Sequence, residues 1–303
     1  MRVSLIVNPV SGRHGGRPAL LRRHIAEAVA VLGRDVAVEV RLTESPGHAT
    51  RLAAAAAADG VEVVAAWGGD GTVNEVATAI AGTASALAIV PGGSGSGLAR
   101  ALGVPLNWRA ALDAVRHGAV RAIDVGRFGG RTFVNVAGVG VDAHVARAFN
   151  ADRAARPGRR GLLTYVRITL REFFRYAAPR VRVTVAGDDI DDHVVLVALA
   201  NSPQYGNGAI IAPGALLDDG LVDVVVVRAT SPVRDLLRAR RLFDGSMARD
   251  AGAVVRRASR VTIAAAQPLA FHTDGEPHAG GTRLEGEMVR AALHVRVPVA
   301  SLR

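Results

Sequence analysis

The chain has 303 residues, and half of them are apolar, so it can bury a sizeable core, and its length favours two domains. It contains no cysteine, which excludes disulfides, thiolate zinc sites and cysteine nucleophiles. All 37 basic residues are arginine, so a Walker-type phosphate loop and Schiff-base chemistry, which need lysine, are excluded, while the net charge of +10 favours an anionic partner.

The first 125 or so residues alternate strand-like and helix-like segments. Strands are predicted over residues 3–7, 36–40, 61–66 and 87–90, and helices over residues 20–32, 49–58 and 73–80. Such an alternation predicts a parallel sheet with helices on both faces, as in Rossmann-like domains. In these folds ligands bind beyond the carboxyl ends of the strands.

The third strand runs into the most informative segment, Gly68-Gly69-Asp70-Gly71-Thr72-Val73-Asn74-Glu75-Val76. A strand, a glycine turn and a helix N-terminus in this order form an anion cradle, because glycines admit a phosphate and the first helical N–H groups point at it. An ordinary strand-to-helix turn is the alternative. The compact run of glycines, Asp70 and Thr72 favours a nucleotide or phosphate site, with Asp70 near a metal ion or a transferring phosphoryl group.

Glycines and polar residues also gather after the other three strands. These loops contain Asn8-Pro9-Val10-Ser11-Gly12, the segment from Thr43 to Ala49, and Pro91-Gly92-Gly93-Ser94-Gly95-Ser96-Gly97. Because the carboxyl ends of parallel strands meet at one edge of the sheet, the four loops are expected to build one site.

From about residue 128 strand-like runs dominate and tight turns separate them. The predicted strands are residues 132–136, 181–185, 194–200, 221–227, 260–265 and 291–297. They predict a second, antiparallel β-domain over 128–303, whose last residues could return to the first domain over 1–127. The fold class expected is therefore α/β plus all-β.

A helical stretch with many arginines interrupts this β region between residues 147 and 175. Its arginines are Arg147, Arg153, Arg156, Arg159, Arg160, Arg167, Arg171 and Arg175, and they alternate with aliphatic and aromatic residues. A helix lying at an anionic membrane surface has this pattern. A helix that packs on the β-domain and leaves its arginines in water explains the pattern equally well.

No segment reaches the length of about 18 apolar residues that a membrane span needs, and the first 12 residues do not resemble a signal peptide. A cytoplasmic protein is therefore expected. Nucleic-acid binding is not expected, because no recognised module is present. Assembly into a homodimer is left open.

The loops together resemble the catalytic family of diacylglycerol kinases, the soluble bacterial lipid kinases related to sphingoid-base kinases. The four loops of the first half carry the resemblance, and so do Ala212-Pro213 through Leu216, Asp218-Asp219-Gly220, Asp223 and Asp274-Gly275-Glu276-Pro277. The resemblance covers nearly the whole chain. It implies an N-terminal nucleotide domain, a C-terminal β-sandwich, and a membrane-bound lipid as the acceptor of the ATP γ-phosphoryl group.

The resemblance also implies roles for individual residues. The residues matching ATP contacts are Asn8, Thr43, Gly68, Gly69, Asp70, Gly71, Thr72, Val73, Asn74 and Ser94. A structural Mg²⁺ would be bound by Asp219 with the carbonyls of Leu216 and Leu221. Glu276 matches the proposed proton acceptor, for which Asp70 is the alternative, and Asp124 matches an acidic position near the lipid hydroxyl.

One loop departs from the family pattern. Many diacylglycerol kinases carry Gly-Thr-x-Asn-Asp-Phe-Ala, where this chain has Gly93-Ser94-Gly95-Ser96-Gly97-Leu98-Ala99, closer to the sphingoid-base kinases. The acceptor is therefore diacylglycerol or a related lipid such as a sphingoid base. NAD kinases, which share the glycine turn, and a silent nucleotide- or lipid-binding regulator are the alternatives. Acidic residues retained at positions 70, 219, 274 and 276 speak against a silent protein.

Overall fold

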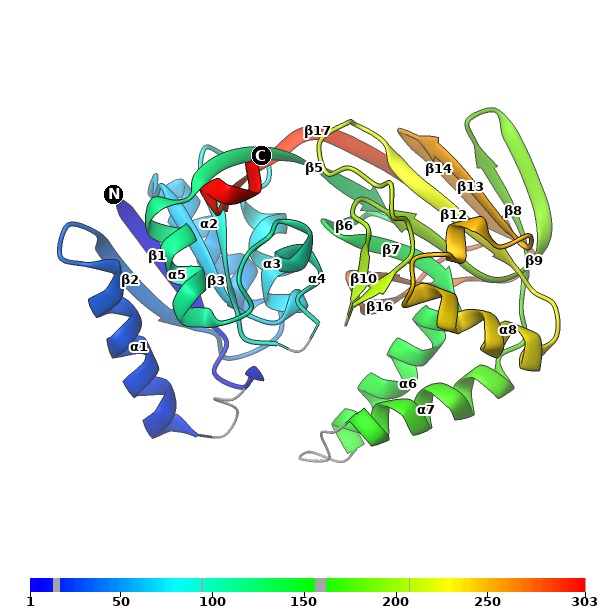
Figure 1. Ribbon diagram of the computed structural model, residues 1–303, viewed down its shortest axis with the longest axis horizontal. Helices are drawn as coiled ribbons and strands as arrows, with labels where there is room; N and C mark the ends of the chain where they lie inside the picture. The colour runs from blue at the N-terminus through cyan, green and yellow to red at the C-terminus, as the bar shows by residue number, and fades with distance from the viewer. Residues whose placement is uncertain (13–16, 94, 156–161, 207, 303) are drawn as a thin grey trace. The chain divides into compact units, whose positions relative to one another are not determined.

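The protein is described by a computed structural model covering residues 1–12, 17–93, 95–155, 162–206 and 208–302 (Figure 1). The chain divides into two compact units. Unit 1 comprises Met1–Val125 and Val289–Arg303, and unit 2 comprises Gly126–Met288. The end of the chain thus belongs to the same unit as its beginning.

Unit 1 is built on a parallel sheet with the strand order β2-β1-β3-β4-β17. The strands are β1 (Arg2–Val7), β2 (Ala37–Leu42), β3 (Val63–Gly68), β4 (Ala86–Pro91) and the last part of β17 (Arg283–Val297). Every residue of β3 and β4 is buried, as expected for central strands covered on both faces. The parallel sheet predicted for the first half of the chain is confirmed.

Helices cover both faces of this sheet (Figure 1). They are α1 (Pro18–Leu32), α2 (His48–Ala58), α3 (Asp70–Ile80), α4 (Gly97–Ala101) and α5 (Trp108–His117). Helices α1 and α5 share one apolar core with β1, β3 and β4, in which Leu5, Leu32, Trp67 and Leu112 are fully buried. Helices α2 and α3 pack against each other and against the sheet. Strand β5 (Ala119–Phe128) pairs with β17.

Unit 2 is an antiparallel β-sandwich, as predicted, and the long strand β9 (Asp188–Ala200) takes part in both of its layers. One layer has the order β16-β15-β7-β9-β12-β13 and the other β9-β8-β14-β17-β5-β6. The further strands are β6 (Arg131–Phe133), β7 (Val136–Gly140), β8 (Arg180–Val185), β12 (Val222–Arg228), β13 (Ala253–Ala258), β14 (Arg260–Ala265), β15 (Ala270–Thr273) and β16 (Glu276–Ala279), with a short pair β10 (Gln204–Gly206) and β11 (Ala209–Ile210).

Alternation along the strands separates two apolar clusters of unit 2. On β12, Val224 and Val226 point into the core of the sandwich, whereas Val225 and Val227 belong to a second cluster on the outer face of the same sheet. Phe173 of α7 and Met247 cover that second cluster. The helical elements of this unit are α6 (Val141–Ala155), α7 (Leu162–Arg175), α8 (Pro232–Ala239), η2 (Arg240–Leu242) and η3 (Met247–Arg249).

Two segments differ from the sequence prediction. The strand predicted over 132–136 is interrupted, because the backbone N–H groups of residues 134–136 donate to the Asp274 carboxylate between β6 and β7. The single helix predicted over 147–175 is two helices, α6 and α7, and residues 156–161 between them lie outside the described part of the chain. In the described residues, no helix has the length and apolar character needed to span a membrane.

Candidate functional site

Three loops at the carboxyl ends of β1, β3 and β4 pack backbone against backbone. A Cβ atom on Gly12 would lie 1.8 Å from the carbonyl oxygen of Gly92, and one on Gly93 would lie 2.8 Å from the Cα of Gly69. The Gly92 N–H also donates to the Gly68 carbonyl at 2.8 Å. Glycine is therefore required at these positions by contacts between the loops. The loops after β1, β3 and β4 therefore meet, as the sequence predicts.

Gly71, in the first turn of α3, has no such packing reason. A Cβ atom there would meet nothing within 4 Å, so the backbone faces open space. The N-cap residue is Gly69, which has no side chain to satisfy the first N–H groups of the helix. A glycine inside a helix costs about 1 kcal/mol relative to alanine. An exposed helix N-terminus without a side-chain cap and with glycine in its first turn is suited to an anion that approaches the backbone closely.

Asn8 and Thr43 extend this edge of the sheet. The side-chain amide of Asn8 donates to the hydroxyl oxygen of Thr72, 3.1 Å away, so the first loop is joined to α3. The backbone N–H of Thr43 donates to the carbonyl of Val7 at 2.9 Å, which holds the start of the second loop beside the first. Asn8, Thr43 and Thr72 are thereby brought to the same edge of the sheet.

Asp70 contacts the backbone of the loop after β4. Its two carboxylate oxygens accept from the N–H groups of Ser96 and Gly97, each at 2.9 Å. A Cβ atom on Gly95 would lie 2.3 Å from Asp70 Oδ2, so this loop can approach the carboxylate only because residue 95 is glycine. Asp70 therefore holds the loop at residues 95–97 against the first turn of α3.

Glu75, which the sequence reasoning did not single out, does the same for the loop after β2. Its carboxylate accepts from the N–H of Gly47 at 2.9 Å and from the N–H of Ala49 at 3.0 Å. Gly47 has φ +76° and precedes α2, whose first N–H groups need an acceptor. The signal available in the sequence is the acid five residues after Asp70, on the helix that carries the glycine turn.

The remaining predicted site residues differ in burial and in their contacts. The side chain of Val73 is buried in the core, and its N–H donates to the carbonyl of Gly69, so Val73 contributes packing. Asn74 is half-buried on the following turn of α3. Ser94 lies outside the described residues. Asp124 on β5 is buried, and its Oδ1 accepts from the N–H of Ala291 at 2.7 Å.

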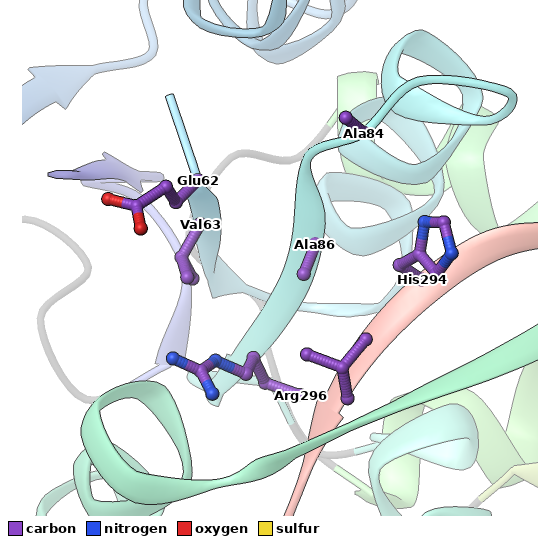
Figure 2. A pocket seen from close by; sticks show the side chains of 7 residues that line it. Glu62, Val63, Ala84, Ala86, His294 and Arg296 are labelled. Atoms are coloured by element: carbon purple, nitrogen blue, oxygen red, sulfur yellow. The ribbon is translucent and has the colours of Figure 1, made fainter. Parts of the chain in front are cut away.

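A pocket of about 300 Å³ opens at the opposite end of the unit 1 sheet (Figure 2). Its lining includes Val63 and Ala86, the first residues of β3 and β4, together with Glu62, His294 and Arg296 (Figure 2). These residues lie at the amino ends of the parallel strands, away from the glycine loops. The pocket is therefore distinct from the predicted nucleotide site.

In unit 2, Asp274 and Gly275 form the turn between β15 and β16. Both have positive φ, +49° and +84°, as a two-residue hairpin turn that follows the twist of its strands requires. The Asp274 carboxylate accepts from the N–H groups of residues 134, 135 and 136, each at 2.9 Å. Asp274 is thus an anchor of the turn. Glu276, the first residue of β16, is exposed.

A polar cluster that the sequence reasoning missed lies beside this turn, around the buried His272. His272 Nε2 is 2.9 Å from Asp142 Oδ2, and the Tyr205 hydroxyl donates to the same carboxylate oxygen. These three residues come from β15, the first turn of α6 and β10. Burial raises the pKa of the Asp142 carboxyl, but the neighbouring His272, and hydrogen bonds from His272, Tyr205 and the Ala143 N–H, outweigh burial and hold that pKa below its ordinary value.

The predicted metal turn is occupied by an ion-pair network. Asp219 Oδ1 accepts from the N–H of Leu221 at 2.9 Å, and its Oδ2 pairs with the guanidinium of Arg257, which also lies 3.5 Å from Asp223. Burial raises the pKa of Asp223, Arg257 opposes this, and Asp219 adds to it. Among the described residues, no group of three or more acidic or histidine side chains is arranged to hold a metal ion. In this structure the cation beside Asp219 is the Arg257 guanidinium, at the turn where the resemblance implies a structural Mg²⁺ bound by Asp219 and the carbonyls of Leu216 and Leu221.

Comparison with known families accounts for both units. The family described as diacylglycerol kinase catalytic domain matches residues 2–128, and the family described as YegS C-terminal NAD kinase beta sandwich-like domain matches residues 135–297. A Pseudomonas fluorescens protein described as a probable lipid kinase, YegS-like, is 34% identical over 278 residues, which cover 91% of this chain and 90% of that protein. A Xanthomonas campestris protein of the same description is 32% identical and covers 91% and 92% of the two chains.

Solved structures agree with this assignment. A Bacillus anthracis protein described as a putative diacylglycerol kinase superposes with a TM-score of 0.80 at 26% identity, covering 99% of this chain and 98% of that one. An NAD kinase from Archaeoglobus fulgidus superposes with a TM-score of 0.54 at 14% identity, a likeness that concerns the fold alone. Taken with the glycine loops of unit 1 and the sandwich of unit 2, these matches show that the chain is a kinase and belongs to the YegS-like lipid kinases of the diacylglycerol kinase catalytic-domain family.

Proposed function

We propose that this kinase transfers the γ-phosphoryl group of ATP, with Mg²⁺, to a hydroxyl group of a membrane lipid, diacylglycerol or a related lipid such as a sphingoid base. The observation that carries the proposal is the uncapped N-terminus of α3, where Gly71 leaves the backbone open to an anion. Family membership supports ATP as the phosphoryl donor. Catalysis of this kind consists mainly of positioning and electrostatic stabilisation.

The backbone at the start of α3 would bind the phosphates. Since the chain has no lysine, the positive charge has to come from helix N–H groups, arginine and metal. Asn8 and Thr72, joined by their hydrogen bond, would line the nucleotide site, with Gly68, Gly69, Thr43 and Asn74 around it. The resemblance adds Ser94 as a further ATP contact.

Mg²⁺ carried with ATP would neutralise the charge that develops on the phosphoryl oxygens. Asp70 is the carboxylate that we propose for the phosphate end of α3. Its two bonds to the N–H groups of Ser96 and Gly97 would keep the loop at residues 95–97 closed over the nucleotide. In this proposal the Asp219 turn takes no part in binding the catalytic metal, since Asp219 pairs with Arg257.

Glu276 is the side chain that we propose as acceptor of the hydroxyl proton. It is exposed and follows a turn that Asp274 anchors through three backbone bonds, so its backbone position is well defined. Asp70 is less suited, because both of its oxygens already accept from backbone N–H groups. Asp124 is buried and would act indirectly, by holding the backbone of β17 at Ala291.

A lipid acceptor requires the reaction to take place at a bilayer surface, and we propose that the enzyme works as a peripheral protein at the cytoplasmic face. The decisive experiment is incubation of the purified protein with labelled ATP and a panel of lipids: diacylglycerol, sphingosine, monoacylglycerol, ceramide and polyprenol. Transfer to one of these lipids, dependent on Mg²⁺, is expected. Transfer to NAD alone, or binding of ATP without transfer to any acceptor, would contradict the proposal.

A further inference from the structure

Helix α8 buries an acidic residue and exposes two large apolar ones. In a surface helix the apolar residues normally face the protein and the charged residues face water. Here Val233 and Leu237, one turn apart, are 62% and 59% exposed, whereas Asp235 is buried. Phe243, just after η2, is 68% exposed. Three large apolar side chains therefore lie in water on one short segment.

A polar network under the helix explains how this orientation is maintained. The Asp235 carboxylate accepts from the N–H and the hydroxyl of Thr230, at 3.0 and 2.6 Å. Arg238 donates to Asp235 at 3.0 Å and also pairs with Asp250, whose carboxylate accepts from the Gly252 N–H. Paired charges attach this face of α8 to the protein. Rotating the helix to bury Val233 and Leu237 would break these bonds.

The neighbouring helix α7 exposes a similar pair. It contacts α8 (Figure 1), and its residues Leu170 and Phe174, also one turn apart, are 39% and 54% exposed. Its acid, Glu172, is turned inward, where it is bound by His144 and by Arg171. Each of the two helices thus presents an apolar pair to solvent. Exposed apolar residues on neighbouring helices are typical of interaction sites.

The charges around these apolar residues are nearly all positive. In the described residues 167–175 and 230–250, the half-exposed or exposed arginines are Arg167, Arg171, Arg175, Arg234, Arg240, Arg241 and Arg249. Arg171 and Arg241 pair with the less exposed carboxylates of Glu172 and Asp250. Asp244 is the exposed acid of these two segments. These two segments therefore combine exposed apolar side chains with exposed arginines.

We propose that α7, α8 and η2 form a membrane-docking surface that binds an anionic bilayer, with Val233, Leu237 and Phe243 entering the interface and the arginines contacting lipid phosphates. Apolar side chains flanked by arginine are what an interfacial helix needs, because the chain inserts apolar area while the long arginine stems keep the guanidinium at headgroup level. The inference rests on the proposed lipid kinase function, for which it names the surface that meets the bilayer.

A second copy of the chain fits this surface less well. A two-fold dimer would place the same patch on both subunits in contact, and so bring one set of seven arginines against the other. An anionic bilayer offers the opposite charge over its whole area. The attraction should fall steeply with salt, since the Debye length shortens from about 10 Å at 0.1 M to about 3 Å at 1 M.

The test is binding of the full-length protein to vesicles of phosphatidylglycerol and of phosphatidylcholine. The triple variant Val233→Gln, Leu237→Gln, Phe243→Gln is expected to bind phosphatidylglycerol vesicles at least about tenfold more weakly than wild type. This is the scale of losing several inserted side chains. The matched control is Leu106→Gln, Val120→Gln, Val299→Gln, which removes three apolar side chains of similar exposure from unit 1 and should bind like wild type. Arg234→Gln with Arg240→Gln should reduce the salt-sensitive part of binding.

A second readout does not depend on the triple variant. Because the chain has no cysteine, Phe243→Cys gives a unique labelling site for an environment-sensitive dye, and Leu106→Cys gives its control. The dye at 243 should move to an apolar environment when phosphatidylglycerol vesicles are added, and the dye at 106 should not. Equal binding of the triple variant and wild type, or a dye at 243 that stays in water, would overturn the inference.

Two further outcomes separate this inference from the proposed function. If wild type forms a dimer in solution that the triple variant does not form, the surface is a protein interface and the membrane assignment is wrong. Phosphoryl transfer to a detergent-dispersed lipid should be the same for wild type and the triple variant. If neither transfers phosphate while wild type alone binds vesicles, the docking surface stands and the proposed kinase reaction fails.

Discussion

His272 Nε2 lies 2.9 Å from Asp142 Oδ2, across 130 residues of sequence, in a buried part of unit 2. The contact joins β15 to the first turn of α6, and Tyr205 adds a third element by donating to the same oxygen. The hairpin that begins with β15 carries the Asp274 anchor and Glu276. The rigidity of the proposed proton acceptor therefore depends on residues far from it in the sequence.

Asp142→Asn should lower the free energy of unfolding at pH 7 by about 1–3 kcal/mol, because it weakens two side-chain hydrogen bonds to a buried group. Since the folded pKa of Asp142 lies below its ordinary value of 3.8, the stabilisation is present above that pH and is lost as the pH falls below it. Urea unfolding between pH 5 and pH 3 should show the variant and wild type converging. The exposed Asp113→Asn is the control, and a pH-independent gap would contradict the assignment.

Asp70→Asn should reduce phosphoryl transfer by about two orders of magnitude or more, on the scale of lost electrostatic stabilisation. It should also destabilise unit 1 by about 1–3 kcal/mol, because an amide cannot accept from both Ser96 and Gly97. Steady-state kinetics and urea unfolding measure the two effects.

Gly95→Ala provides the control for Asp70, since it displaces the same loop while keeping the carboxylate charge. If both variants lose activity equally, Asp70 acts by positioning the loop. A larger loss in Asp70→Asn would show that its charge acts on the phosphate or the metal. Normal turnover of Asp70→Asn would remove it from the mechanism.

The ion pair at the Asp219 turn predicts that chelators leave the melting temperature of the wild-type protein unchanged. Arg257→Gln should lower that melting temperature, because it leaves Asp219 and the buried Asp223 without their cation. The pKa of Asp223 is raised in the folded protein, so the protein loses stability as the pH rises through that pKa and Asp223 becomes charged. Arg257 lowers this pKa, so its loss makes the charged Asp223 more destabilising. The variant should thus be more destabilised at pH 7 than at pH 4.5.

Arg256→Gln is the matched control for Arg257, since Arg256 pairs with the exposed Asp188. Its effect on melting should be small, as for most surface ion pairs. A wild-type protein that melts at a lower temperature in chelator would instead support a structural metal at this turn.

His278 predicts that the stability of the folded protein falls as the pH falls through the neutral range, whereas charging Asp223 lowers stability as the pH rises. Burial, then the charges of Arg131 and His272, lower its pKa from the ordinary value of 6.5, so the folded protein binds fewer protons there than the unfolded chain. Stability should therefore decline as the pH falls from about 7 to 5. His278→Gln should flatten that decline in urea unfolding, whereas the exposed His117→Gln should leave it as in wild type.

Much of unit 1 could be predicted from the sequence, because its signals are local. The apolar runs of β1, β3 and β4 and the helical spacing of α1 and α3 identify their elements within a few residues. The glycine turn before α3 can likewise be recognised from its own residues. In unit 2 the sequence predicts the Asp274-Gly275-Glu276-Pro277 turn but not the strands β15 and β16 that flank it, because each has only four residues.

The remaining features depend on residues distant in sequence. That Asp70 binds the 95–97 loop, that Asp274 interrupts the strand at 134–136, and that Arg257 neutralises Asp219 are all consequences of chain segments meeting in the fold. The sequence by itself determined which residue types stand at each strand end and which elements form, because propensity and periodicity are properties of neighbouring residues. Only the tertiary structure decided which carboxylates are bonded to backbone N–H groups or to arginine, and which face of α8 is exposed to solvent. Both outcomes depend on burial and on partners that packing brings together.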